Sequence, residues 1–252
     1  MPANYAHHRF GKQVLKTMPP EQKQCIQRFR RMYDLGLHGP DIFFYYNPFV
    51  RTAAGDLGGT FHRMTGGDFF PTTCRAATSE AAKAYLYGLL GHYCLDALCH
   101  PMVNRLDAIG EAKHALLEAE FDRYLLTLDG ETSPETFDMS RKLKPTRGEC
   151  MTVAEFYPGA TGGNVSRSVK NMAFLVRFLA KPGSEKLLKT LKLPFVDNKI
   201  PAQENEELAV YVGELKGLYD QAVEQYPEML AQLLAHMEQE TPLGENFGKD
   251  FG

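Results

Sequence analysis

The spacing of apolar residues is helical along most of the chain. Apolar side chains recur every three or four positions, as on one face of an α-helix, in six segments. These predicted helices are residues 20–35, 79–100, 110–128, 166–180, 203–221 and 226–238. The strict alternation typical of half-buried β-strands is nearly absent. The sequence therefore predicts an all-α fold, a multi-helix bundle that forms a single domain over residues 1–252.

The segments between the predicted helices have the composition of turns and loops. Residues 51–75 are rich in Gly and polar residues and are predicted to form a long loop with a short helix. Residues 129–150 are predicted to form a polar loop. Residues 158–164 contain three glycines but neither a G-K-[ST] sequence nor a preceding strand. We interpret them as a connection between helices rather than as a phosphate loop.

An aromatic run follows a tight turn in the first part of the chain. Gly39 and Pro40 fix the backbone directly ahead of Asp41. Residues 43–49 then read F-F-Y-Y-N-P-F. The run fits ordinary core packing, and it is also the best candidate in the sequence for the apolar wall of a cleft.

Composition and charge exclude several classes of protein. The chain has 252 residues, 44% of them hydrophobic, which is enough for a substantial core. Its net charge of −3 does not suggest a nucleic-acid partner bound through its phosphates. No run of apolar residues is long enough to span a membrane, and residues 1–8 lack the apolar region of a signal peptide. We therefore expect a cytoplasmic protein without a transmembrane segment.

The five cysteines do not form a disulfide pattern, since their count is odd and their spacing irregular. Cys94 and Cys99 lie within a predicted helix on either side of Asp96, and we expect both to be buried thiols, with metal ligation as the less favoured alternative.

Metal-capable side chains are concentrated in the helix predicted over residues 79–100. His92, Asp96 and His100 are each four residues apart, so on a helix they lie on one face, within an arc of roughly 80°. Pro101 is predicted to end this helix. Burying two imidazoles and a carboxylate on one face is costly unless something binds them. A metal ion would offset that cost, and hydrogen bonds among the three groups would be the alternative.

Further candidate ligands precede and follow this helix. His114 and Glu118 repeat the four-residue step on the next predicted helix, and Asp122 follows one turn later. The full set of candidates is His7, Asp41, His62, His92, Asp96, His100, His114 and Glu118. Eight ligands are too many for one zinc ion, which takes three or four, and they suit a cluster of two or three ions.

In its order of ligands the chain resembles the zinc-dependent phospholipases C of bacteria and their relatives, the fungal single-strand nucleases. The order is His, Asp, His, then H-x-x-x-D, His and H-x-x-x-E, and here it covers residues 1–122. Proteins of this type are all-α and carry a trinuclear zinc cluster. The resemblance implies that residues 1–122 build the metal site and that residues 150–240 complete the helical domain.

The resemblance also implies which residues share each zinc ion. These would be Asp41, His62, His92 and Asp96 for the first ion, His100, His114 and Glu118 for the second, and His7 with the bridging Asp96 for the third. The implied reaction is hydrolysis of a phosphodiester by a water molecule that the metal activates. Asp41 would double as the general base. The substrate class would be a phospholipid head group, a nucleotide or another phosphoester.

Three features depart from the family pattern. Three residues separate Asp96 from His100, whereas the family usually has five; the helix phase still permits ligation, but the ion positions could differ. Secreted members bind zinc through an N-terminal Trp, and this chain has no Trp. Removal of Met1 would expose Pro2, whose nitrogen is the predicted substitute. His7 and His8 are adjacent, and spacing favours His7 as the ligand.

Other functions remain open at this point. One is a metal-stabilised binding or scaffolding protein that kept the zinc site and lost turnover. Another is a helical interaction protein whose His and acidic residues form a buried network without metal. Manganese or iron would also suit these ligands. Glu111 and His114 fit half of a di-iron motif, but the second half is missing, and the chain has no His-Asp pair of the HD hydrolases. His38 and Asp122 are predicted to orient ligand imidazoles.

Overall fold

The computed structural model describes residues 4–47, 52–193 and 195–252. Within these ranges the regular elements are helices, and no strand is formed. The predicted all-α fold is therefore confirmed. The α-helices are α1 Asn4–Val14, α2 Pro20–Arg28, α3 Arg30–Gly36, α4 Ala53–His62, α5 Gly66–Thr73, α6 Glu80–Ala108, α7 His114–Leu128, α8 Arg147–Ala154, α9 Gly162–Leu179, α10 Ser184–Thr190 and α11 Ala209–Gln239. The 3₁₀ helices are η1 Gly39–Tyr45, η2 Cys74–Ala76, η3 Pro134–Thr136, η4 Ser140–Lys142, η5 Val196–Asn198, η6 Glu206–Leu208 and η7 Glu245–Phe247.

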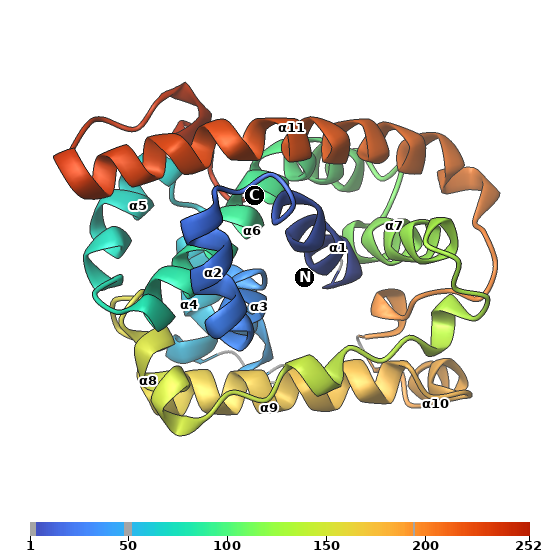
Figure 1. Ribbon diagram of the computed structural model, residues 1–252. Coiled ribbons are helices and arrows are strands. Elements are labelled where there is room, and N and C mark those ends of the chain that lie inside the picture. Colours follow the sequence, from blue (N-terminus) through green and yellow to red (C-terminus); the bar gives the residue numbers. More distant parts are fainter. Residues whose placement is uncertain (1–3, 48–51, 194) are drawn as a thin grey trace.

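Helix α6 runs through the middle of the molecule and is buried on nearly every face. It packs against α1, α2, α3 and α11 (Figure 1). A helix surrounded by protein on all sides needs no polar face, and α6 is apolar over most of its length. The Ser79 side chain caps its first turn by accepting the Ala82 N–H. The metal-capable side chains of α6 are therefore placed in the core.

Two glycines allow α3 and α6 to cross at very short range. A Cβ atom on Gly36 would lie 2.2 Å from the Tyr85 carbonyl oxygen. A Cβ atom on Gly88 would lie 2.2 Å from the Tyr33 carbonyl oxygen. Any larger residue at either position would push the two backbones apart. The close crossing fixes the 3₁₀ helix η1, which follows α3, beside the metal-capable face of α6.

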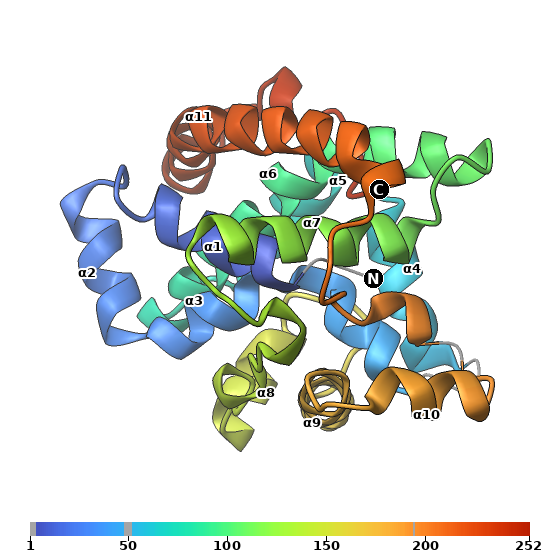
Figure 2. The same ribbon diagram turned by 90° about the vertical axis from the view of Figure 1, so that its right-hand side faces the viewer.

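The longest surface helices lie on opposite edges of the molecule. In Figure 1, α11 forms the upper edge, whereas α9 and α10 form the lower one. Figure 2 shows the same separation after a quarter turn, with α1 and α7 between the two edges. Among the described helices, none combines the length and apolar character that a bilayer crossing requires.

Two prolines lie inside helices that were predicted to be shorter. The end predicted for α6 at Pro101 is wrong, because the helix continues to Ala108. Proline removes one backbone hydrogen bond, but the turns after it bury Met102, Val103 and Leu106. Similarly, the helices predicted over residues 203–221 and 226–238 are one helix, α11, with Pro227 inside it. Packing against the core outweighs the local preference at both places.

Two other predictions are wrong for local reasons. The helix predicted over residues 20–35 is divided at Phe29, whose φ of −120° and ψ of 41° are not helical. The long loop predicted over residues 51–75 is largely helical, since it contains α4 and α5. Thr52 and Thr65 cap these two helices by accepting the N–H groups of Gly55 and Asp68.

The remaining boundary predictions had mixed outcomes. The helix predicted from residue 110 starts at residue 114, and the loop predicted over residues 129–150 contains η3, η4 and the start of α8. The prediction that residues 158–164 connect two helices is confirmed, because they lie between α8 and the first turn of α9. The expected burial of the Cys94 and Cys99 thiols is also confirmed.

Candidate metal centre

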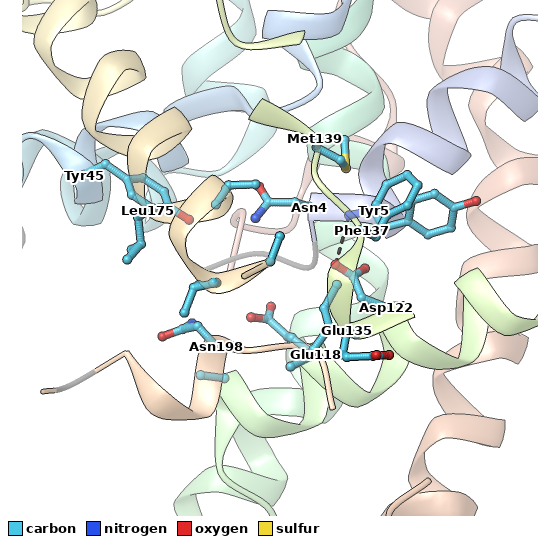
Figure 3. Close-up of a pocket in the computed structure, with 16 residues that line it drawn as sticks. Asn4, Tyr5, Tyr45, Glu118, Asp122, Glu135, Phe137, Met139, Leu175 and Asn198 are labelled. Atoms are coloured by element: carbon cyan, nitrogen blue, oxygen red, sulfur yellow. Dashed lines mark hydrogen bonds between the residues drawn. The ribbon is translucent and has the colours of Figure 1, made fainter. Parts of the chain in front are cut away.

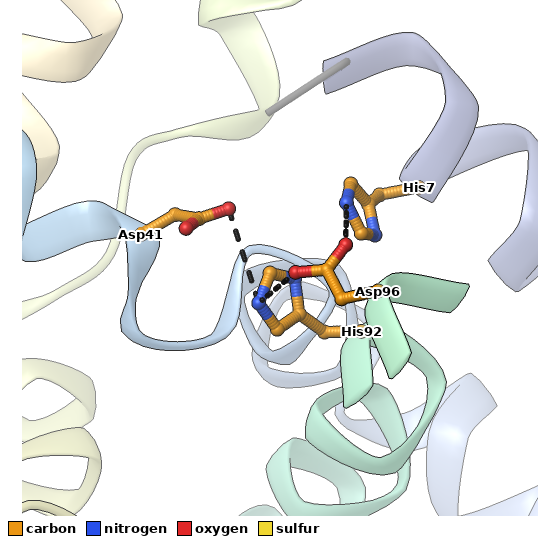
Figure 4. Close-up of side chains that lie close together, drawn as sticks. All are labelled: His7, Asp41, His92 and Asp96. Carbon is orange, nitrogen blue, oxygen red and sulfur yellow. Dashed lines mark ion pairs between the residues drawn. The ribbon is translucent and has the colours of Figure 1, made fainter. Parts of the chain in front are cut away.

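The first group of ligand-capable side chains brings three segments of the chain together. His7 comes from α1, Asp41 from η1, and His92 and Asp96 from α6 (Figure 4). One ligand atom from each residue lies within 4.8 Å of the others. All four residues are at most 3% exposed. The arrangement is one that could hold a metal ion.

Asp96 lies at the middle of this first group. Its Oδ1 atom is 3.1 Å from His7 Nε2, and its Oδ2 atom is 3.0 Å from His92 Nε2. The same Oδ2 atom is 3.8 Å from His100 Nδ1. The imidazole rings of His7 and His92 stack with their centroids 4.6 Å apart. One carboxylate therefore faces three imidazoles. For two of them, His92 and His100, the four-residue spacing on α6 predicts this arrangement.

Asp41 joins the first group from the opposite side and contacts a further histidine. The Nε2 atom of His62, at the end of α4, is 2.8 Å from Asp41 Oδ1. His92 Nε2 is 3.8 Å from Asp41 Oδ2. Gly39, with a φ of +48°, turns the chain over the ring of His92, where a Cβ atom would lie 2.2 Å from Cδ2. His62 is thus in contact with the group, although it is not one of the four converging residues.

The second group consists of His100 near the end of α6 and of His114 and Glu118 on α7. Glu118 Oε1 lies 3.3 Å from His100 Nε2 and 3.1 Å from His114 Nε2. The His114 side chain is 26% exposed, whereas those of His100 and Glu118 are each 8% exposed. The second group is therefore less enclosed than the first, and Asp96 is the side chain that links the two.

Backbone carbonyls orient two of the imidazoles. His62 Nδ1 donates to the Gly58 carbonyl oxygen at 2.8 Å, and His100 Nδ1 donates to the Phe251 carbonyl oxygen at 2.7 Å. A carbonyl only accepts, so the proton of each neutral ring is on Nδ1 and the Nε2 lone pair is available. Metal-binding histidines are commonly held by this arrangement. Phe251 also donates its N–H to the His62 carbonyl oxygen at 3.0 Å.

The first group contains several buried polar atoms without a hydrogen bond of acceptable geometry to any described residue. They are His7 Nδ1, Asp41 Oδ2, His92 Nδ1, His92 Nε2 and Asp96 Oδ2. Each such atom costs about 1–3 kcal/mol when it is left unsatisfied. A bound cation would take up the lone pairs of the carboxylates and imidazoles. Imidazole and carboxylate ligands suit zinc, so the residues present fit a zinc ion.

Burial and mutual charge set the protonation of the group. Burial lowers the pKa of His92 to about 4, which keeps its imidazole neutral, as a metal ligand must be. Burial also disfavours the charged form of His100, but the carboxylates of Asp96 and Glu118 outweigh it and raise its pKa to about 10. Burial would raise the pKa of Asp96, yet the neighbouring histidines hold it well below its usual range. Without a cation, protonated histidines balance the buried carboxylates.

A pocket adjoins the second group (Figure 3). Its empty volume is about 670 Å³ including space open to solvent, and Glu118 and Asp122 lie on its α7 side. Its apolar lining residues are Phe137, Met139, Leu175, Val176, Leu179 and Ile200. Asn4, Asn198 and Glu135 are polar groups in the same lining. Three of the apolar residues belong to α9, so one helix supplies much of the apolar wall.

The aromatic run contributes to this wall less than the sequence suggested. Among its described residues only Tyr45 lines the pocket. Phe43 instead packs edge-on against Tyr157 in the core, with ring centroids 5.0 Å apart, and Phe44 contacts His62. Phe49 lies outside the described residues. Core packing is therefore the main role of the run. The α9 residues that form the wall in its place were not predicted, although they recur at helical spacing.

Asp122 and His38 were predicted to orient ligand imidazoles, and the contacts of Asp122 are of another kind. Asp122 accepts the backbone N–H groups of Tyr5 and Ala6 at 2.9 and 2.8 Å. It thereby anchors the first turn of α1 and positions His7 through the backbone, rather than by binding an imidazole as expected. His38 is buried at 3% exposure.

The adjacent histidines of α1 point to different neighbours. His7 lies 3.1 Å from Asp96, whereas His8 Nε2 lies 2.6 Å from Lys142 Nζ. The structure therefore brings His7, and not His8, to the first group. Met1 and Pro2, the latter predicted as a ligand through its nitrogen, lie outside the described residues.

A family model described as zinc dependent phospholipase C matches residues 6–156 of the chain. This range contains all eight candidate ligands and more than half of the sequence. A comparison with curated proteins and a comparison with solved structures give no match.

Proposed function

Since the chain belongs to the zinc-dependent phospholipase C family, we propose that it is a zinc-dependent enzyme that hydrolyses phosphodiesters. The observation that carries the proposal is the place of Asp96. It faces His7 and His92 of the first group and His100 of the second, and the second group adjoins a pocket with an apolar wall. A shared carboxylate between two ligand groups suits a cluster of ions rather than a single one.

We propose that the eight candidate ligands hold two or three zinc ions. The first group and His62 would hold one or two of these, and His100, His114 and Glu118 would hold another. When bound, zinc supplies Lewis-acid activation of water and neutralises the charge of the phosphate. The cytoplasmic location expected from the sequence stays a prediction.

Asp41 is the residue best placed to handle the proton of the attacking water. Its Oδ1 atom is occupied by His62 at 2.8 Å, whereas its Oδ2 atom has no hydrogen bond of acceptable geometry to a described residue. A carboxylate that is fixed at one oxygen and open at the other can orient a water molecule and accept its proton. Burial would raise the pKa of Asp41, but His92 and His62 hold it below its usual range, so the group is ionised and ready to accept.

The pocket would hold the rest of the substrate. Glu118 belongs both to the second ligand group and to the pocket lining, so a phosphate at the centre would have its ester arm in the pocket. The lining contains no Lys or Arg among the described residues, so its side chains offer no cation for a second phosphate. Apolar residues of α9 would instead cover an apolar arm and exclude water from it. A phosphodiester with an apolar arm, such as a phospholipid, fits better than a nucleotide.

The proposal is tested by metal content and turnover measured on the same sample. Protein purified without added metal or chelator is expected to contain two or three zinc ions per chain and to hydrolyse phosphodiesters, including choline-type phospholipids. Zinc without turnover on any phosphodiester would instead favour the metal-stabilised binding protein. Absence of zinc, with the fold intact and no uptake of added zinc, would refute the enzyme and leave a buried polar network.

A further inference from the structure

The outer face of α9 carries a regular stripe of exposed cations around one exposed aromatic residue. The stripe consists of Arg167, Lys170, Phe174 and Arg177, which are three or four residues apart and share one face of the helix, and of Lys181, which follows two residues after its end. Phe174 is 73% exposed, more than any other large hydrophobic residue among those described. An aromatic ring in water with cations on both sides is an unusual surface for a helix to present.

The following segment continues the same composition. Lys186 and Lys189 on α10 and Lys192 after it are exposed, as are Leu187 at 46% and Leu191 at 57%. Residues 162–193 contain seven Lys or Arg and one acidic residue, Glu185, which pairs with Lys189. We refer to the exposed side chains of residues 167–192 as the basic edge.

The basic edge stands apart from the charge of the rest of the molecule. Residues 162–193 carry a formal charge of +6, whereas the whole chain carries −3, so the other residues together carry −9. On the opposite edge, α11 exposes acidic residues, among them Glu214, Asp220, Glu224 and Glu228. Such a charge distribution orients the molecule in front of an anionic surface, with α9 and α10 toward it and α11 away.

We propose that the basic edge docks the protein on an anionic lipid membrane. Each Lys or Arg close to an anionic bilayer adds about 1 kcal/mol of attraction, which corresponds to about fivefold in affinity. Phe174, Leu187 and Leu191 would enter the interface between head groups and acyl chains, as apolar residues of surface-bound amphipathic helices do. Charge alone would also suit a nucleic acid, but three exposed apolar side chains among the cations favour lipid.

Docking by this edge would place the pocket close to the lipid. Leu175, Val176 and Leu179 line the pocket from the inner face of α9, while Phe174 and Arg177 belong to its outer face. The two faces are separated by one helix, about 10 Å across. The membrane surface would then lie one helix diameter from the pocket wall. Docking itself needs no hydrolysis, so the proposed surface and the proposed activity can fail independently.

The experiment is co-sedimentation of the full chain with vesicles of phosphatidylcholine alone and of phosphatidylcholine mixed with phosphatidylglycerol. Lipid phosphorus recovered with the vesicles is measured in the same samples, so hydrolysis is not mistaken for loss of binding. We expect binding to the anionic vesicles, weakened when salt shortens the Debye length from about 10 Å to 3 Å. The pair Lys170→Glu and Lys181→Glu should weaken it at least about tenfold.

The control carries the same change in charge elsewhere. Lys16 and Arg28 are exposed on or near α1 and α2, so Lys16→Glu with Arg28→Glu should leave vesicle binding within about twofold. Phe174→Ala should weaken binding to anionic vesicles, whereas Ile109→Ala, at a residue 62% exposed, should not. Circular dichroism establishes that each variant is folded.

Four outcomes would overturn the proposal. They are no binding to anionic vesicles, equal binding to neutral ones, an equal loss in the Lys16 and Arg28 control, and no effect of Phe174→Ala. A DNA oligonucleotide is assayed alongside the vesicles. If it binds as tightly as the anionic vesicles and Phe174→Ala weakens neither, the basic edge is a general polyanion site and not a membrane surface.

Discussion

The two ligand groups are built from similar residues but sit in different surroundings. The first, His7, Asp41, His92 and Asp96, is assembled from α1, η1 and α6 and is at most 3% exposed. The second takes all its residues from the end of α6 and from α7, and its Glu118 lines the pocket. The first group is therefore part of the core, whereas the second lies between the core and the pocket.

This difference indicates what each group contributes. Polar side chains closed off from water destabilise the fold unless they are paired, so the first group couples metal binding to stability. The second group keeps a partly exposed imidazole, and under the proposed function its neighbouring pocket would give a substrate access to it. Stability and turnover should therefore respond differently to changes in the two groups.

The largest effect is expected where the two groups meet. Asp96→Asn keeps the size of the side chain but removes the negative charge that faces three imidazoles. We expect kcat/KM for phosphodiester hydrolysis to fall at least about 100-fold, with zinc per chain reduced as well. Elemental analysis and steady-state kinetics measure both. Asp220→Asn, on the surface of α11, is the matched control and should change neither.

Replacing one histidine from each group separates stability from turnover. In chelated protein, His92→Ala should lower the free energy of unfolding by about 3 kcal/mol, because it leaves a cavity in place of a fully buried ring that stacks on His7. His114→Ala should lower it by less than about 1 kcal/mol, since that side chain is partly exposed. Both variants should lose most of the activity of the zinc-loaded enzyme.

Urea unfolding and kinetics provide the measurements for this pair. His236→Ala on α11 is the control, because His236 belongs to neither group, and its activity should be that of the unaltered protein. Equal destabilisation by His92→Ala and His114→Ala would contradict the distinction between a core group and a pocket group.

Metal removal should show the same distinction as a difference in rate. A chelator reaches the second group from the pocket, but it reaches the first only when the core opens. We expect two phases of zinc release, the slower by at least about tenfold. A colorimetric zinc dye follows the release, and His114→Ala should abolish the fast phase. A single phase in the unaltered protein would indicate that the two groups exchange metal together.

The smallest effect concerns His8, which is next to ligand candidate His7 but belongs to neither group. Burial, with the charge of Lys142 adding to it, lowers the pKa of His8 to about 3. The folded protein keeps this imidazole neutral, whereas the unfolded chain binds a proton below pH 6.5. The contribution of the neutral His8 imidazole to the free energy of unfolding is therefore fully present above pH 6.5 and is lost as the pH falls toward 3.

His8→Gln should remove that dependence. At pH 5 the His8 imidazole lowers the free energy of unfolding by about 2 kcal/mol relative to pH 7. The variant should therefore lose less of its free energy of unfolding than the unaltered protein between pH 7 and pH 5. Urea unfolding at several pH values measures this slope. Zinc content at pH 7 should be unchanged, and a loss of zinc in His8→Gln would identify His8, rather than His7, as the ligand.

Local periodicity predicted the core of the candidate site. The four-residue steps from His92 to Asp96 and from His114 to Glu118 require only a helix, and both helices are present. The convergence of α1, η1 and α6 is a tertiary arrangement, which the order of ligands predicted through family resemblance and not through spacing. The assignment of each residue to a particular ion stays a prediction.

The features that the sequence did not indicate depend on distant contacts. The carbonyl of Phe251, 151 residues away, orients His100, and a backbone group has no signature in the side-chain sequence. The apolar wall of the pocket comes from α9, far along the chain from the ligands. Pro101 and Pro227 have helix-breaking preferences that burial of their helices overrides. In each case the deciding energy lies between segments that are remote in sequence.

The contact of Phe251 with His62 and His100 also has a consequence for biosynthesis. A ribosome releases the segment with the candidate ligands, residues 7–118, long before residue 251. During that interval His100 lacks the carbonyl that fixes its tautomer, and the aromatic ring that lies beside His92 is still missing. Contacts between segments this far apart in sequence form late and slowly. The final geometry of the centre therefore forms only after Phe251 itself has been synthesised and has reached His62 and His100.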